Sequence, residues 1–188
     1  MTDMFRDFED DLLTGNIAEK QIHDKFEQVF IPIIERIIYD PNNKESVILQ
    51  KAGVDGILST NAVGFDIKCR RFETYKYDDI LLETVSIREH NIRGWLYKSD
   101  VVVYVWHNIS KTSFIDGYIL YLDKIVPWFD ENKHKFKTKI AFSKRNGVKW
   151  STENKAVPIN IFPVGSIKQI PRSVFNHCTQ AVLANMDE

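Results

Sequence analysis

Two carboxylates and an ammonium group, at Asp55, Asp66 and Lys68, lie close together in the sequence. Asp66 and Lys68 belong to a run, Val63 to Arg70, in which apolar and polar side chains alternate. Such alternation predicts a β-strand, which places Asp66 and Lys68 on one face, roughly 6–7 Å apart along it. Carboxylate oxygens suit a hard cation, and a lysine beside it can serve as a base or stabilise charge. These residue types therefore predict a metal-assisted reaction centre.

A second short β-type run, residues 54–58, carries Asp55 and is joined to the first run by a polar turn that contains glycine. If the two runs pair as a hairpin, Asp55 comes opposite Asp66 and Lys68. Cleavage of a phosphodiester needs charge neutralisation on the phosphate and a water delivered in line with the leaving oxygen. We expect Asp55 and Asp66 to hold Mg²⁺, with the backbone carbonyl of Ile67 as a third ligand and Lys68 assisting the nucleophile.

Upstream of these runs, residues 17–39 repeat apolar side chains at helical spacing and predict a long helix. Pro32 lies inside the pattern and allows a kink or break there. At helical spacing, Glu27 falls at the edge of the apolar stripe and Glu35 almost opposite it. Glu27 is therefore the better candidate for a further acid that binds the metal directly or through water.

The rest of the chain predicts one mixed sheet with helices packed against it. Residues 101–106 (VVVYVW) give the strongest signal for a buried strand. Residues 80–86 predict a strand with an acid, Glu83, inside an apolar run. If Glu83 is buried, it requires a partner such as Lys68 or an arginine; the alternative is that it faces solvent on an edge strand. Further predicted elements are strands at 47–49, 117–121, 133–140 (lysines on one face) and 157–163 (an edge or terminal strand), and helices at 123–129 and 173–186.

Length and composition fit a globular domain, with 188 residues of which 44% are hydrophobic and 27% charged. We expect one domain over 1–188, with a core over about 17–106, and 107–188 completing the sheet and available to set specificity. No run of about 18 apolar residues predicts a membrane span. The acidic N-terminus does not resemble a signal peptide, and two cysteines without metal-type spacing favour a reducing, cytoplasmic setting.

The net charge of −1 conceals an uneven distribution. Residues 1–40 hold ten Asp and Glu against four Lys and Arg, whereas residues 132–149 hold seven Lys and Arg and no acid. A basic sector is compatible with a polyanionic ligand, and a solvated charged face is the alternative.

The order of helix, strand with Asp55, and strand with Asp66-Ile67-Lys68 resembles the PD-(D/E)XK nuclease superfamily, the restriction-endonuclease-like fold. The resemblance covers roughly residues 20–106, with Val54 in place of the proline of the motif and Glu27 at the position of an additional helical acid. It implies an α/β fold with a central mixed sheet flanked by helices, and Mg²⁺-dependent hydrolysis of DNA in which Mn²⁺ substitutes for Mg²⁺. Many nucleases of this fold act as dimers, so the resemblance leaves a homodimer open.

Several basic side chains follow the acid-x-Lys motif. Arg70 shares the predicted face of Asp66 and Lys68 and is a candidate for contact with a phosphate. Other candidates for a DNA-binding groove are Arg71, Lys76, Arg88, Arg93 and Lys98. Two alternative functions stay open: a nucleic-acid-binding module that does not cleave, and a structural or interaction protein in which Asp66 and Lys68 form a surface ion pair.

Overall fold

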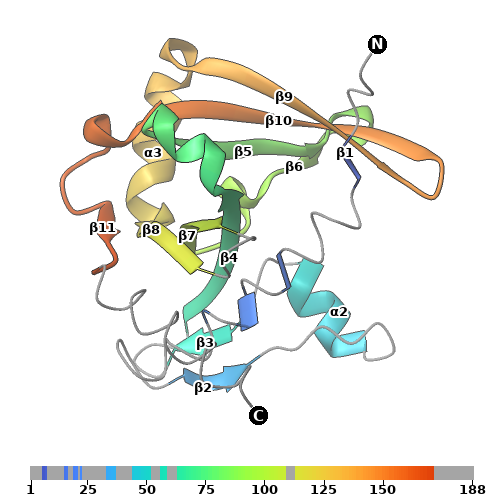
Figure 1. The fold of residues 1–188 in the computed structure, drawn as a ribbon, viewed down its shortest axis with the longest axis horizontal. Coiled ribbons are helices and arrows are strands. Elements are labelled where there is room, and N and C mark those ends of the chain that lie inside the picture. Colours follow the sequence, from blue (N-terminus) through green and yellow to red (C-terminus); the bar gives the residue numbers. More distant parts are fainter. Residues whose placement is uncertain are drawn as a thin grey trace.

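The computed structural model describes residues 6–7, 15–16, 19–20, 22, 33–36, 44–51, 56–58, 63–108 and 113–171, which form a mixed α/β structure with two sheets (Figure 1). The six-stranded sheet has the order β11 (Ile167–Gln169), β8 (Ser113–Tyr121), β7 (Val101–Asn108), β4 (Val63–Arg71), β3 (Gly56–Leu58) and β2 (Ile33–Arg36). The five-stranded sheet has the order β1 (Arg6–Asp7), β9 (Lys137–Arg145), β10 (Val148–Pro158), β5 (Asp79–Ile87) and β6 (Ile92–Arg93). Among the described residues, the helices are α2 (Lys44–Lys51) and α3 (Leu122–Asn132), and residues 15–16, 19–20 and 22 are also helical. Short 3₁₀ turns are η1 (Phe72–Tyr77), η2 (Arg88–His90), η3 (Trp95–Tyr97), η5 (Lys133–Lys135) and η6 (Ile159–Ile161).

Strand β7 lies at the centre of the core, as its continuous β-branched and aromatic sequence predicts. It pairs in parallel with β4 and antiparallel with β8. Val103 and Val105 pack on one face of the six-stranded sheet together with Phe65, Ile67 and Ile22. On the other face, side chains of β7 pack with β5, η3 and α3; the members from β7 are Val102, Tyr104 and Trp106.

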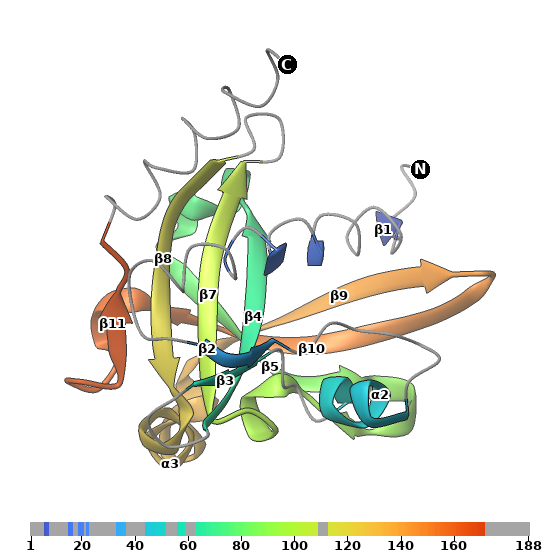
Figure 2. The same ribbon diagram turned by 90° about the horizontal axis from the view of Figure 1, so that it is seen from below.

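The second face of the six-stranded sheet is covered by the five-stranded sheet, and Figure 2 shows β9 and β10 running across the direction of β4, β7 and β8. Strands β9 and β10 form a long hairpin whose turn extends away from β8 (Figure 2). Its turn residues, Asn146 (φ 50°) and Gly147 (φ 81°), both have positive φ. An Asn-Gly pair suits a two-residue turn of this kind, because the turn requires positive φ at both positions.

Most of the strand predictions that fall within the described residues are confirmed. The hairpin of β3 and β4, the strands β5, β7 and β8, and the helix α3 lie where periodicity placed them. The mixed character of the six-stranded sheet is also confirmed, since the β4–β7 pairing is parallel and the others are antiparallel. The chain differs from the prediction in forming two sheets, because β5, β9 and β10 pair with each other and not with β7.

Two predictions near the N-terminus are wrong. The predicted helix over 17–39 does not continue to its end, because Ile33–Arg36 forms strand β2 and pairs with β3. Pro32 precedes this strand and cannot supply the N–H that a continuing helix needs there. The predicted strand at 47–49 is part of helix α2, Lys44–Lys51, whose flanking Lys, Glu and Gln residues favour a helix.

Two predictions in the second half need correction as well. Residues 133–135 form a 3₁₀ turn that extends α3, so the lysine-bearing strand begins at Lys137. The predicted edge strand at 157–163 ends at Pro158, and β10 lies inside its sheet between β9 and β5. The helix predicted at 173–186 lies outside the described residues. No helix in the described ranges is long and apolar enough to cross a membrane.

Candidate functional site

Asp66 and Lys68 lie on the same face of β4 and contact each other, as the alternating sequence predicts. The Lys68 ammonium donates a hydrogen bond to Asp66 Oδ1 at 2.7 Å and lies 2.6 Å from Oδ2. Asp66 is only 3% exposed, whereas the side chain of Lys68 is 34% exposed. Because the Asp66 carboxylate is buried, the pair is not the solvent-exposed surface pair that the sequence left open. A buried charge is costly without a partner, and Lys68 is that partner here. Ser99 Oγ adds a longer contact of 3.4 Å to Asp66 Oδ2.

A cleft of about 240 Å³ opens at this pair and brings in residues from three other elements. Besides Asp66 and Lys68, its walls are formed by Lys51 at the end of α2, Glu83 and Ser86 of β5, Trp95 of η3, and Lys98. Three lysines and two acids meet here, so the cleft carries one more positive than negative formal charge. This excess of positive charge allows an anionic ligand to enter the cleft and to approach the carboxylates of Asp66 and Glu83.

Glu83, whose place the sequence left open, is held by hydrogen bonds at one oxygen. Ser86 Oγ donates to Glu83 Oε1 at 2.5 Å, and the Trp95 backbone N–H donates to the same oxygen at 3.4 Å. Gly94 makes this approach possible, because a Cβ at that position would lie 2.1 Å from the Glu83 carbonyl oxygen. The Gly94 N–H also donates to Thr84 O at 2.9 Å, which fixes the loop against β5. Glu83 therefore points into the cleft of Asp66 from a well-defined position.

Glu19 is an acid near the pair that the sequence analysis missed. Burial raises the pKa of Glu19 above its ordinary value; the nearby Lys68 ammonium lowers this pKa and the Asp66 carboxylate raises it further. Both effects require Glu19 to lie close to β4. The spacing in the sequence could have indicated this acid. Ile22 follows Glu19 by three residues, which places both on the same side of a helix, and the structure packs Ile22 in the cluster of Phe65.

The other predicted acids are not all described. Asp55 and Glu27 lie outside the described residues, and Glu35 belongs to β2. Gly56, which follows Asp55, pairs with Phe65, which precedes Asp66. The backbone of Ile67 pairs with Val103 of β7. Among the described residues, no group of three or more His, Cys, Asp or Glu side chains is gathered as a metal site.

The predicted basic residues separate into two groups. Arg70 and Arg71 line a larger groove of about 650 Å³ between β4 and the β9–β10 hairpin, together with Lys139 and Asn154. Arg70 is engaged there with Asp79, donating to its carboxylate at 2.5 Å and to its backbone carbonyl at 2.8 Å. Lys76 and Arg93 are exposed, on η1 and β6, and do not line either cavity.

Cys69, on the opposite face of β4, is not a nucleophile. Burial, with a smaller contribution from the Glu19 carboxylate, raises the pKa of the Cys69 thiol to about 12. The thiol therefore stays protonated at neutral pH, and the thiolate is the reactive form.

Comparison with models of protein families and with curated proteins finds no match for this sequence. A buried carboxylate, a partly exposed lysine on it and a second carboxylate in the same cleft can together hold a cation, a phosphate or both.

Proposed function

We propose that this protein is a Mg²⁺-dependent nuclease that hydrolyses phosphodiester bonds in DNA, with a centre of the restriction-endonuclease type. The observation that carries the proposal is the Asp66 carboxylate, buried to 3% exposure yet directed into a cleft that also holds Lys68 and Glu83. Its ion-pair partner is a lysine two residues away on the same strand, and a buried ion pair is weak evidence for stability, so the burial of this acid favours a role in binding a ligand.

The donor set of the cleft fits a hard cation. Mg²⁺ prefers oxygen ligands and is commonly held by one or two carboxylates plus phosphate oxygens, while it keeps several waters. Asp66 and Glu83 would hold it here, and Asp55, Glu27 and the Ile67 carbonyl are the further ligands that the sequence predicts. When bound, the ion would lower the pKa of a water and neutralise charge on the scissile phosphate; Mn²⁺ is expected to substitute.

The lysines of the cleft supply the remaining chemistry. Lys68 is partly exposed and can turn from Asp66 toward a phosphate oxygen, where its ammonium stabilises the charge that develops in the transition state. Lys51 and Lys98, which also line the cleft, are candidates for contacts with neighbouring phosphates. Glu83, held by Ser86 and the Trp95 N–H, keeps its second oxygen for a ligand or for the attacking water.

The decisive experiment compares cleavage of plasmid and linear DNA, with Mg²⁺ or Mn²⁺, by the wild type, Asp66→Asn and Lys68→Met. We expect either substitution to lower the cleavage rate by at least about a hundredfold, because each removes a charged group that acts on the transition state. Lys124→Met, which changes an exposed lysine of α3 outside the cleft, is the matched control and should cleave normally. Full activity in Asp66→Asn would remove this mechanism.

A thermal melt provides an independent readout of the metal. Mg²⁺ or Mn²⁺ that binds only the folded protein raises the melting temperature, and this rise should disappear in Asp66→Asn. A melting temperature that does not respond to either ion in the wild type would contradict the metal assignment.

A second candidate function is DNA binding without cleavage. It is favoured by one specific observation: the Lys68 ammonium contacts both oxygens of Asp66, in a cleft where lysines outnumber acids. This alternative predicts salt-dependent binding of DNA and no turnover with any divalent metal. A protein with neither binding nor a metal response would instead be a structural or interaction protein.

A further inference from the structure

We propose that one face of the β9–β10 hairpin binds the phosphate backbone of duplex DNA and leads it to the Asp66 cleft. The turn end of the hairpin extends beyond its pairing with β5 (Figure 2), and residues 137–149, which form β9, the turn and the start of β10, contain five Lys and Arg and no acid. The binding itself is independent of the proposed nuclease activity; only the direction toward the cleft rests on it.

The strand register decides which side chains share a face, because residues directly opposite in an antiparallel pair point the same way. On one face, Lys137 and Lys139 follow each other along β9, and Arg145 lies at the turn. Their partners across the hairpin, Ala156, Asn154 and Val148, are uncharged, as are Thr152 and Trp150, which lie between them on the same face. We call this surface the basic face. Lys137, Lys139 and Arg145 are all exposed.

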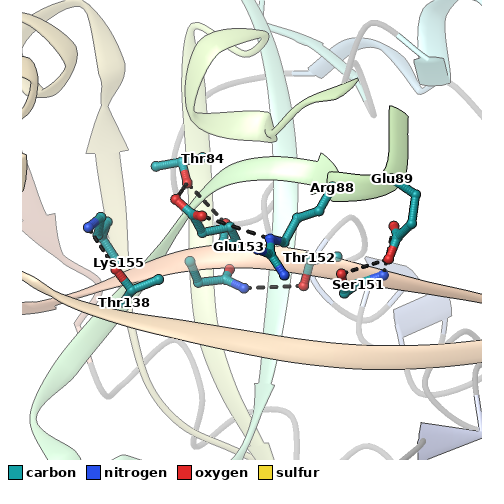
Figure 3. A network of polar contacts seen from close by, with 9 residues as sticks. Thr84, Arg88, Glu89, Thr138, Ser151, Thr152, Glu153 and Lys155 are labelled. Atoms are coloured by element: carbon teal, nitrogen blue, oxygen red, sulfur yellow. Dashed lines mark hydrogen bonds and ion pairs between the residues drawn. The ribbon is translucent and has the colours of Figure 1, made fainter. Parts of the chain in front are cut away.

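The opposite face of the hairpin differs from the basic face because acidic side chains of the protein, Glu89 and Glu153, make polar contacts there. Glu89 accepts hydrogen bonds from the Ser151 N–H at 3.1 Å and from Ser151 Oγ at 2.8 Å. Glu153 accepts a hydrogen bond from Thr84 Oγ1 at 3.2 Å and lies 4.0 Å from Arg88 Nε. Figure 3 shows this network of β5, η2 and β10 side chains. Lys144 and Lys149 lie on this opposite face, directly across from each other at the turn end.

The basic face is continuous with the candidate catalytic cleft. Asn154 of β10 pairs with Lys139 of β9 on one side and with Glu83 of β5 on the other. Lys139, Asn154 and Glu83 therefore form a row across three strands, and neighbouring strands are about 4.8 Å apart. Lys139 and Asn154 also line the groove that contains Arg70 and Arg71. A ligand lying along the basic face would reach Glu83 without crossing an acidic surface.

The spacing of the charges indicates an extended polyanion. Lys137 and Lys139 lie about 6–7 Å apart along the strand, and Arg145 lies about 20 Å further on. A small anion would require cations that converge, whereas these are spread along one line. The major groove of B-DNA, about 12 Å wide, admits a two-stranded β-ribbon, and the phosphates border the groove. The turn end of the hairpin, which carries Arg145, fits such a groove, and Lys137 and Lys139 lie further along the same face, where β10 also pairs with β5, and can contact the bordering phosphates.

The test measures binding of a fluorescent DNA duplex in EDTA, where no cleavage occurs, at several salt concentrations. The test variant is Lys139→Ala/Arg145→Ala, and the matched control is Lys144→Ala/Lys149→Ala, which removes the same charge from the opposite face of the same hairpin. We expect the test variant to raise the dissociation constant about tenfold and to reduce the salt slope by about 1.8, since each lost phosphate contact removes about 0.9. The control should bind almost as the wild type does. Thermal melts verify that both variants fold.

Equal weakening by both pairs would overturn the assignment to one face, and wild-type binding by the test variant would overturn the site. Tighter binding to single-stranded DNA or RNA of the same length, or to anionic vesicles, would overturn the assignment to duplex DNA. The nuclease proposal fails separately: if the wild type binds duplex through the basic face but does not cleave with Mg²⁺ or Mn²⁺, the basic face stands and the catalytic assignment is removed.

Discussion

Strand β4 carries two ion pairs on the same face, and they differ in what they connect. The Arg70–Asp79 pair joins β4 of one sheet to the start of β5 in the other, and Arg70 also donates to the Asp79 carbonyl at 2.8 Å. Its two side chains are 13% and 15% exposed, so both charges are sequestered. The Asp66–Lys68 pair lies within a single strand, with a buried acid and a lysine that reaches the cleft.

The difference indicates which pair serves the fold and which serves a ligand. A pair that links two sheets constrains their relative position and leaves no charge available to a ligand. A pair between residues two apart on one strand constrains nothing that the strand does not already fix. The lysine of the second pair is in contact with solvent and can be reached by a ligand, whereas the arginine of the first pair is sequestered.

The same substitution in both pairs gives the largest expected difference. Asp79→Asn leaves the Arg70 guanidinium with a neutral partner in a sequestered site, and we expect a loss of about 3 kcal/mol in the free energy of unfolding. Asp66→Asn leaves Lys68 partly exposed and in contact with solvent, and should cost about 1 kcal/mol or less. Urea unfolding of both variants checks this order. Equal costs would show that the two pairs do not differ in role.

Gly94→Ala tests whether the loop at Gly94 positions Glu83 in the cleft. A methyl group there would lie 2.1 Å from the Glu83 carbonyl oxygen, so β5 or the loop must shift. We expect a loss of about 2 kcal/mol in the free energy of unfolding, as for other overpacked sites. Because Trp95 N and Glu83 move apart, cleavage should fall as well. Wild-type stability and activity in Gly94→Ala would mean that the loop does not position Glu83.

Glu19→Gln is expected to have the smallest effect, and its sign depends on pH. The pKa of Glu19 is raised by burial, so ionising it costs the folded protein more than the unfolded chain. This destabilising effect of ionisation is absent when the pH is below 4.5, the ordinary pKa of the carboxyl group, and is complete when the pH is above the raised pKa. Glu19→Gln should therefore raise the melting temperature at neutral pH and give no advantage in acid.

Glu73, which is exposed on η1, provides the control for removing an acidic side chain as such, and Glu73→Gln should leave the melting temperature almost unchanged. If Glu19→Gln destabilises the protein at neutral pH, the acid is a structural partner of Lys68. If it stabilises the protein and weakens the metal-dependent rise in melting temperature, Glu19 belongs to the metal site.

The sequence alone determined the local features of the site. Alternation in β4 placed Asp66 and Lys68 on one face, and the β-branched and aromatic run of β7 predicted a buried strand. These features follow from the two-residue period of a strand, which is a property of neighbouring residues. The short β3–β4 hairpin was predictable for the same reason.

Only the tertiary structure decided which acids and lysines join this pair. Glu83 reaches the cleft because β5 belongs to a second sheet that crosses the first, and Gly94 lets η3 approach it. Ile33–Arg36 is a strand although its apolar spacing also fits a helix, because it pairs with β3. Pairing partners and sheet crossings depend on contacts between residues far apart in the chain, and periodicity carries no information about them.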